Sequence, residues 1–458
     1  MKKSLLLATM LLAGSSAFAA KDAATYEPVD GYTLTNLWVR SQFIGTEDWN
    51  ALPIPGPNYA RTSAIYGDKV YIAQSKKTGG DGLVDEGSLI ELDFMTGEVV
   101  RTIDLTIDGA PMSGLLCANQ VVADDFGHLL VGSYIASSFV AANPETGAEA
   151  HANPIKIYDV DLTNGACTLV AELGIPEDEA EANVTGRIDY FDVIGDITGA
   201  KAPATVMCAI ASGQTPAIYG WRLEQGETEW HGHLAGGEYV ADYMREVFPA
   251  DQTQWGTAPF VRILKDEEFS GELFYVDGNT TVPSLYNTEG TMIESFASVE
   301  TELWPSTGAN GVGEFSIGGD NFVAYVEGQY DAPHSCQVYI CKLGENSSFE
   351  GMQKMYLFPT EGLGQTSDAG NRIHSIATKV VTDENGKEGA YVLTHKCANG
   401  IGVYLFAQEG FQSGVKGVEV VEENAPVEYF NLQGVRVANP ENGLYIRRQG
   451  AKAEKVVL

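Results

Sequence analysis

Apolar and polar residues alternate with a period of two over most of the chain, and helical periodicity is nearly absent. Glycine, asparagine and aspartate bound the alternating segments, and the chain contains 51 glycines. Successive side chains of a β-strand point to opposite faces of its sheet, so this alternation is typical of half-buried strands. The pattern predicts an all-β fold in which short strands are joined by tight turns.

A degenerate repeat groups these strands into units of four. Each unit opens with a hairpin whose second strand ends in small residues, and another hairpin follows, such as SLIELDFMTGEVVRTIDL at 88–105. A glycine in that turn suits a positive φ. The opening hairpins lie at 61–75, 115–135, 187–212, 260–278, 312–328 and 372–395. Four-stranded units repeated in this way are typical of β-propeller blades.

We count six blades, and the sixth lacks its outer strand. After its opening hairpin the sequence supplies one further strand, GIGVYLFAQ, whereas YTLTNLWVRSQF at 32–43 has no hairpin partner nearby. Pairing of these two segments would remove an exposed sheet edge. The sequence therefore predicts a six-bladed propeller closed by an N-terminal strand. A seven-bladed ring is the alternative, because the unit at 187–256 is long enough to contain further strands.

The two ends of the chain differ in composition from its body. Residues 1–19 combine two lysines, a short apolar run and Ala-Phe-Ala, which is the pattern of a secretory signal peptide. No apolar stretch is long enough to span a bilayer, so we expect no transmembrane segment. Residues 412–426 have the composition of a linker, which divides a propeller at 20–411 from a small C-terminal β module at 427–458.

The formal net charge of −34 excludes some classes of partner. Nucleic-acid binding depends on contacts between Lys or Arg and phosphate, so a chain this acidic argues against a nucleic-acid partner. The same charge argues against anionic membrane surfaces. Neutral glycans, peptides and cations remain as candidate partners, and the charge also keeps a secreted protein soluble.

The common signatures of metal, nucleotide and nucleophile sites are absent from the sequence. There is no phosphate-binding loop, no G-x-S-x-G elbow and no H-E-x-x-H helix. The calcium-like DVDLTNG at 159–165 has its ligands out of register. The pairs His334/Cys336 and His395/Cys397 have nothing that fixes their distance for zinc. We therefore expect no metal and no cofactor, and no obligatory framework of disulfides among the six scattered cysteines.

An arginine opens the predicted innermost strand in three repeats. These residues are Arg61, Arg187 and Arg372. The innermost strands of a propeller line its channel, and their starts meet at one mouth. Three guanidiniums there would form a cationic ring that suits recognition of carboxylate or phosphate. The alternative is that each arginine bonds carbonyls or carboxylates of neighbouring blades.

Loop residues before other innermost strands complete the predicted ligand-binding set. Asn310 lies near the predicted mouth, and Trp255 and Trp304 precede innermost strands. An exposed indole on a loop can stack on a sugar or a peptide, although packing between blades is an equal alternative. Among the carboxylates, Asp124 and Asp125 fall in the predicted turn of the second blade, which favours a role in that turn.

The C-terminal segment EYFNLQGVRVANPENGLYIRRQGAKAEKVVL resembles the sorting-type tail of secreted Bacteroidota proteins. The matching elements are the aromatic-Asn-Leu-x-Gly run within 429–435, Asn-Gly-x-Tyr-Ile at 442–446, and a basic last strand. The resemblance implies type IX-like export through the tail, and a location outside the cell or on its outer surface, with the periplasm as an alternative. The body resembles secreted β-propellers of the same phylum, whose surface proteins often capture glycans.

These patterns predict a secreted or cell-surface propeller that binds or scaffolds a glycan or a peptide at its channel mouth, and they favour a non-enzymatic role. Two alternatives stay open: a polysaccharide-degrading hydrolase or lyase, and a structural surface protein. Two carboxylates about 5–10 Å apart at the mouth would favour a hydrolase. Arginines without acidic partners would favour anion binding, and an apolar plug would favour a structural role.

Overall fold

The structure of the chain is a computed structural model, and it describes part of the sequence. The predicted signal peptide, and all of the predicted linker except Gln412, lie outside the described residues. The described residues are 24–41, 60–77, 85–135, 137, 139–174, 187–211, 217–233, 239–240, 244–247, 259–278, 281–296, 299–303, 305, 311–327, 336–364, 374–397, 399–412, 427–430, 436–437, 444–449 and 452–457.

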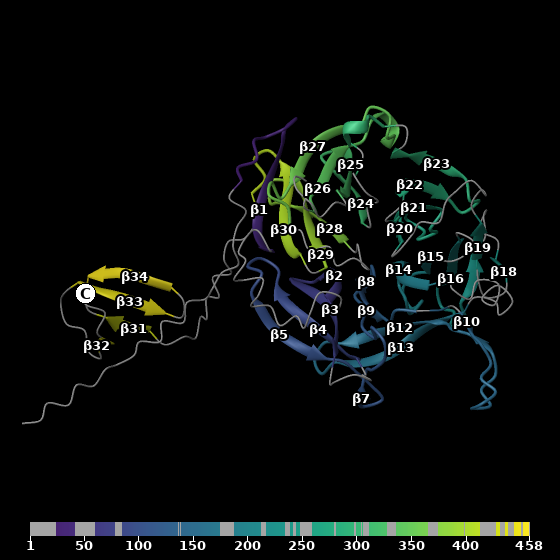
Figure 1. The fold of residues 1–458 in the computed structure, drawn as a ribbon. Helices are drawn as coiled ribbons and strands as arrows, with labels where there is room; N and C mark the ends of the chain where they lie inside the picture. Colours follow the sequence, from purple (N-terminus) through teal and green to yellow (C-terminus); the bar gives the residue numbers. More distant parts are fainter. Residues whose placement is uncertain are drawn as a thin grey trace, which may run out of the picture. The chain divides into compact units, whose positions relative to one another are not determined.

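Six antiparallel sheets stand around a central channel as the blades of a β-propeller (Figure 1). The described residues contain strands and two short 3-10 helices, and no α-helix. From the channel outward, the first blade consists of β2 (Ala60–Tyr66), β3 (Lys69–Lys77), β4 (Asp85–Asp93) and β5 (Val99–Asp104). The second blade consists of β8 (Gln120–Ala123), β9 (Leu129–Gly132), β12 (Ile155–Asp161) and β13 (Ala166–Leu173). The third blade consists of β14 (Arg187–Gly195), β15 (Ala204–Ala211), β16 (Ala217–Leu223) and β17 (His231–His233).

The remaining three blades have four strands each. The fourth blade consists of β20 (Phe260–Ile263), β21 (Leu273–Gly278), β22 (Thr281–Asn287) and β23 (Met292–Ser295). The fifth blade consists of β24 (Val312–Ile317), β25 (Asp320–Val326), β26 (Val338–Lys342) and β27 (Gln353–Phe358). The sixth blade consists of β28 (His374–Thr382), β29 (Glu388–Lys396), β30 (Gly400–Gln408) and β1 (Tyr32–Ser41). The 3-10 helices are η3 (Thr301–Leu303) and η4 (Glu345–Ser347).

Extra strands enlarge the second and third blades. The second gains β6 (Thr106–Ile107) and β7 (Ala110–Pro111), while β10 (Phe139–Val140) and β11 (His151–Ala152) form a separate hairpin. In the third, β18 (Tyr239–Val240) pairs with β17, and β19 (Met244–Val247) pairs with β16. The long third unit therefore extends one blade, and the ring has six blades rather than seven.

The ring closes where the N-terminal strand completes the sixth blade, as the sequence predicted. β1 pairs antiparallel with β30 from Tyr32↔Gln408 to Ser41↔Gly400, with one irregularity between Asn36 and Trp38. The Tyr32 hydroxyl donates to Asp320 Oδ2 at 2.7 Å, which ties the strand to the fifth blade. Each edge of β30 consequently has a hydrogen-bonded partner strand within the sixth blade.

The core consists of separate apolar clusters between neighbouring blades. Phe315 and Phe322 of the fifth blade, for example, pack with Tyr32 and Phe406 of the sixth, and the Phe322 and Phe406 ring centroids are 4.8 Å apart. Packing of sheet faces in this way buries the apolar half of each alternating strand. All six cysteines lie in this buried part, with free thiols.

A second compact unit comprises residues 382–387 and 410–458. Its antiparallel sheet has the order β32-β31-β33-β34. The strands are β31 (Val427–Phe430), β32 (Arg436–Val437), β33 (Leu444–Gln449) and β34 (Lys452–Val457). No helix that is long and apolar enough to cross a membrane occurs in the part of the chain that the structure describes.

Candidate functional site at the central channel

The innermost strand of every blade faces the channel. Residues near the ends of these strands, among them Tyr66, Asp125, Lys265 and Lys379, line one shared cavity. The starts of the same strands therefore meet at the opposite end of the channel. We call these two places the turn-side cavity and the strand-start mouth.

Asp189 organises the strand-start mouth. Its Oδ1 lies 3.1 Å from Nη2 of Arg61, and its Oδ2 lies 2.8 Å from Nε of Arg187. The Asp189 and Arg61 side chains are fully buried, whereas the Arg187 side chain is 19% exposed. Because a carboxylate and a guanidinium form strong charge-assisted hydrogen bonds, this arrangement fixes the first blade to the third.

Side chains from the second and third blades complete the group, which we call the mouth cluster. Arg61 also donates to Asn119 Oδ1, and Asn119 in turn donates to the backbone carbonyl of Asp189. The ring of Tyr134 lies 5.6 Å from the guanidinium carbon of each arginine. The mouth cluster comprises Arg61, Asn119, Tyr134, Arg187, Asp189 and Tyr190.

The structure describes two of the six predicted ligand-binding residues. Arg61 and Arg187 converge, but both bind Asp189, so neither is the acid-free cation that the ring hypothesis required. The carboxylate lies on the same strand as Arg187 and, for Arg61, on a blade that is not adjacent, and a ligand-binding role for the two arginines stays a prediction. The other four predicted residues lie outside the described residues: Arg372, Asn310, Trp255 and Trp304.

Asp277 is a buried carboxyl group next to the mouth cluster. It pairs with Phe260 across β20 and β21, and Phe260 packs against Tyr190. Neither carboxyl oxygen has a hydrogen-bond partner that meets geometric criteria. Burial raises the pKa of Asp277 well above its usual value, opposed by the Gly311 backbone amide and by Arg262. Burial therefore favours the neutral form of Asp277 over the charged form.

His395 is a second buried titratable group at this end of the channel. It lies two residues before Cys397, which packs with Tyr190 and Phe260. Both ring nitrogens are without a hydrogen-bond partner. Burial, assisted by the charge of Lys396, lowers the pKa of His395 to about 3, so the imidazole is neutral at physiological pH.

Buried polar atoms without partners are rare in folded proteins, and each one asks for an explanation. Several of those that the described residues contain belong to this end of the channel. They are Nη2 of Arg187, the hydroxyl of Tyr190, the carboxyl of Asp277 and the ring nitrogens of His395. Sequence reasoning missed Asp277 because nothing in its local pattern separates it from the rest of the 62 acidic residues. This concentration makes the strand-start mouth the candidate functional site.

The turn-side cavity has a volume of about 550 Å³ and receives residues from all six innermost strands. At its deep end, Nη1 of Arg262 lies 2.9 Å from Oδ1 of Asp192. The same guanidinium donates to the carbonyls of Val312 and Ile376 at 3.3 and 3.2 Å. Arg262 thus reaches from the fourth blade to the third, fifth and sixth.

Hydrogen bonds between blades surround the turn face. All but one join successive blades, and the bond from Lys265 to Asp125 joins the fourth blade to the second. They are Tyr66 Oη to Gly127 O at 2.7 Å, Gly195 N to Asp125 Oδ2 at 2.8 Å, Lys265 Nζ to Asp125 Oδ1 at 2.7 Å, Tyr275 Oη to Glu314 Oε2 at 2.7 Å, Gly318 N to Glu388 Oε2 at 2.7 Å, and Lys379 Nζ to Gly67 O at 2.7 Å.

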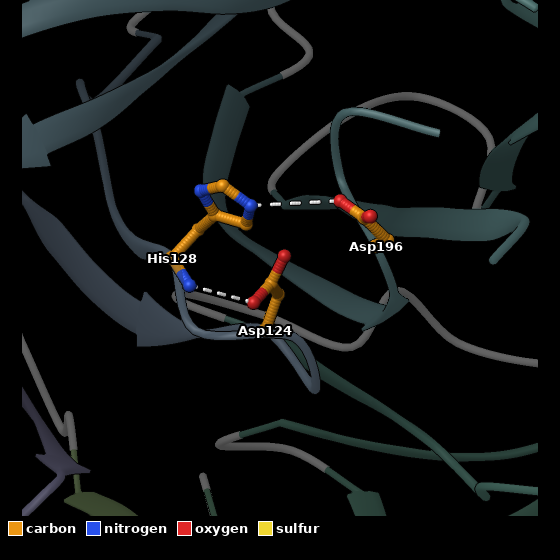
Figure 2. Close-up of side chains that lie close together, drawn as sticks. All are labelled: Asp124, His128 and Asp196. Atoms are coloured by element: carbon orange, nitrogen blue, oxygen red, sulfur yellow. Dashed lines mark hydrogen bonds and ion pairs between the residues drawn. The ribbon is translucent and has the colours of Figure 1, made fainter. Parts of the chain in front are cut away.

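Asp124, His128 and Asp196 come close enough together to be considered as metal ligands (Figure 2). Their oxygens are, however, already in use. Oδ1 of Asp124 accepts the backbone amides of residues 126–128, and its Oδ2 accepts that of Ile197. Oδ1 of Asp196 accepts from Thr198, and its Oδ2 accepts from the amide of Lys201.

His128 completes this arrangement from the turn of the second blade. Its Nδ1 lies 2.9 Å from Oδ2 of Asp159, and its Nε2 lies 3.5 Å from Oδ1 of Asp196. The geometry favours a lock between the turns of the second and third blades over a metal centre, because aspartate side chains commonly bind their own turn amides. This agrees with the turn role that the sequence favoured for Asp124.

Comparison with known proteins yields similarity of structure alone. No family model and no curated protein matches the chain. A variant of an α-L-arabinofuranosidase from Fusarium graminearum, in complex with an iminosugar inhibitor, is 10% identical with a TM-score of 0.40, over 77% of this chain and 95% of that one. The β-propeller domain of the Trilobed protease from Pyrococcus furiosus is 11% identical with a TM-score of 0.28, over 76% and 92%.

An α-L-arabinofuranosidase from Lactobacillus brevis is also similar. It is 10% identical with a TM-score of 0.30, over 85% of this chain and 98% of that one. Because the identities and the TM-scores are low, these similarities carry no argument about activity.

Proposed function

We propose that this propeller acts on glycans at the strand-start mouth, and that hydrolysis of a glycosidic bond is the activity its carboxyl groups support best. One observation carries the proposal: the two carboxyl groups at the mouth, those of Asp189 and Asp277, have different surroundings. Asp189 lies between two guanidiniums, whereas Asp277 is buried and keeps its proton. Glycoside hydrolysis uses such a pair, a protonated acid and a carboxylate.

In this proposal Asp277 donates its proton to the oxygen of the leaving sugar, a water molecule adds to the anomeric carbon, and the proton that this water loses restores Asp277. Its burial matters because removal from water is what keeps a carboxyl group protonated at neutral pH. Asp189, positioned by Arg61 and Arg187, supplies negative charge close to the developing positive charge on the sugar ring. The Arg187 side chain is partly exposed, so its guanidinium can donate to a sugar hydroxyl or carboxylate at the mouth.

Capture of a glycan without cleavage is the second candidate, and the partly exposed guanidinium of Arg187 favours it. Capture requires only this donor. It does not require the proton on Asp277. The two candidates therefore depend on different residues and can be separated by substitution.

The test compares the wild type with Asp277→Asn on a panel of arabinan, xylan, mannan and pectin, by release of reducing sugar. Loss of a general acid lowers rates by about 10²–10⁴-fold. Asparagine has the shape of a protonated aspartic acid, so we expect the melting temperature at neutral pH to be at least that of the wild type. Glu91→Gln, which changes a buried carboxyl group of β4 in the first blade, serves as the matched control and should keep full activity.

Binding to a glycan array completes the test. Hydrolysis is rejected if the wild type cleaves no member of the panel, or if Asp277→Asn cleaves as fast as the wild type. Capture is then supported if Arg187→Met loses array binding while Arg101→Met, on the outer strand β5, keeps it. A protein that neither cleaves nor binds any glycan overturns the whole proposal.

A further inference from the structure

We infer that the turn-side cavity is a second binding site, which takes a neutral, hydroxyl-rich ligand about the size of one or two sugar rings. This goes beyond the proposed function, because it concerns the opposite end of the channel. The volume of about 550 Å³ lies within the usual range for small-molecule pockets. All six innermost strands contribute to its wall, so the site exists only in the closed ring.

Arg262 and Phe260 separate this cavity from the mouth cluster. The guanidinium of Arg262 spans the channel through its bonds to Asp192, Val312 and Ile376. The ring of Phe260 packs on the other side against Tyr190, with ring centroids 5.7 Å apart. Arg262 and Phe260 thus form the floor of the cavity. A ligand in the cavity contacts the Arg262 side of this floor and does not contact Asp189 or Arg187.

The charges around the cavity are largely neutralised by one another, which favours a neutral ligand. Arg262 is paired with Asp192, and Lys265 with Asp125 at 2.7 Å. The oxygens of Asp124 accept backbone amides of its own turn and of the next blade. Glu314 accepts a hydrogen bond from the Tyr275 hydroxyl at 2.7 Å, and burial raises the pKa of its carboxyl group.

Hydrogen-bonding groups of both kinds face the cavity, which favours hydroxyl groups on the ligand. Each innermost strand pairs with a neighbour on one side only, so its other edge turns backbone N–H and C=O groups toward the channel. The hydroxyls of Ser63 and Ser375, 3.4 Å apart, lie on this wall. A hydroxyl both donates and accepts, whereas an anion such as phosphate or carboxylate uses the acceptors of the wall poorly.

Two substitutions test the site by different means. Ala377 is a half-buried wall residue, and Ala377→Phe fills the cavity without adding charge. Lys379 is exposed at the rim and donates to Gly67 O, so Lys379→Met removes a donor with little risk to folding. Arg187→Met, in the mouth cluster, reports on the other end of the channel.

The experiment measures saturation-transfer NMR and calorimetric affinity for glucose, galactose, arabinose, maltose and glycerol, with glucuronate as the charged counterpart of glucose. We expect at least one neutral sugar to bind more tightly than glucuronate. Ala377→Phe should weaken that binding at least tenfold and Lys379→Met severalfold, whereas Arg101→Met, which lies outside both sites, should leave it unchanged. A thermal melt shows whether Ala377→Phe is folded. If that variant is not folded, the affinity of Lys379→Met for the sugar tests the cavity in its place.

Three results overturn the inference. They are the absence of binding by every neutral sugar, tighter binding of glucuronate than of glucose, and binding that survives the cavity variants but is lost in Arg187→Met. The last result would place the sugar at the mouth cluster. Hydrolysis is measured independently with Asp277→Asn, so failure of the cavity site and failure of the proposed function are distinguishable.

Discussion

The guanidinium of Arg262 and the carboxylate of Asp192 form an ion pair across the channel, with Nη1 2.9 Å from Oδ1. The second oxygen of Asp192 accepts the backbone amide of Ile263 at 2.8 Å. The Asp192 side chain is 3% exposed, whereas that of Arg262 is 25% exposed. Burial raises the pKa of Asp192 and Arg262 opposes the rise, so the charge of this carboxylate depends on its partner.

Arg262→Met should therefore destabilise the propeller. Removal of one partner from a buried ion pair leaves an uncompensated charge, which lowers the free energy of unfolding by about 3–5 kcal/mol. Urea unfolding measures the loss, and the double variant with Asp192→Asn should recover at least half of it. Lys156→Met breaks the exposed pair with Glu172 and should lose less than about 1 kcal/mol. Equal losses for Arg262→Met and Lys156→Met would contradict this account.

Asp277→Asn should change how stability depends on pH. The pKa of Asp277 is raised in the folded state, so above the unfolded pKa of about 3.9 the folded chain keeps a proton that the unfolded chain loses. This makes the wild type less stable as pH rises, until pH exceeds the folded pKa. The advantage of the variant should grow by up to about 1.4 kcal/mol per pH unit. Chemical denaturation between about pH 5 and pH 8 measures it, and a constant difference would refute the assignment.

Gly97→Ala should be more damaging than Gly67→Ala, although both glycines have a positive φ, +69° and +60°. A Cβ at Gly97 would meet the ring of Trp38, whereas one at Gly67 meets nothing within 4 Å. Both variants carry the left-handed strain of about 1–2 kcal/mol, and Gly97→Ala adds about 1–3 kcal/mol from overpacking. Thermal unfolding compares them, and equal melting temperatures would mean that the Trp38 contact is unimportant.

A chain that begins at residue 42 should lose the closed ring. It lacks β1, so β30 presents an unpaired edge, and the bond from Trp38 Nε1 to Phe94 O at 2.8 Å is absent. Exposed edge strands pair with other chains, so size-exclusion chromatography should show aggregation and calorimetry a broadened transition. A chain that ends at residue 412 keeps every blade and is the matched control, with an unchanged propeller melting temperature.

Strand pattern and hairpin spacing were sufficient to predict the fold, because alternation and turn glycines are local properties. The sequence placed β1 in the sixth blade by noticing that one segment lacked a partner and that another lacked a strand. It could not decide between six and seven blades, because whether β18 and β19 join the third sheet depends on pairing across the blade.

The candidate site was less accessible to sequence reasoning. Arg61 and Arg187 were found because of their place at the start of a repeat, and Asp189 lies only two residues after Arg187. That Asp189 also binds Arg61 depends on how the first and third blades meet across the channel. The unpaired states of Asp277 and His395 likewise arise from burial by several blades, which no local pattern records.

The closing strand has a consequence for how the protein is made. Thr33 and Ala407 are hydrogen-bonded although 374 residues separate them. A ribosome therefore releases β1 long before β30, the strand that it must join. The blades made in that interval form an arc that is still open, and a chain that stops early cannot close. The ring therefore closes only after nearly the whole propeller has been synthesised.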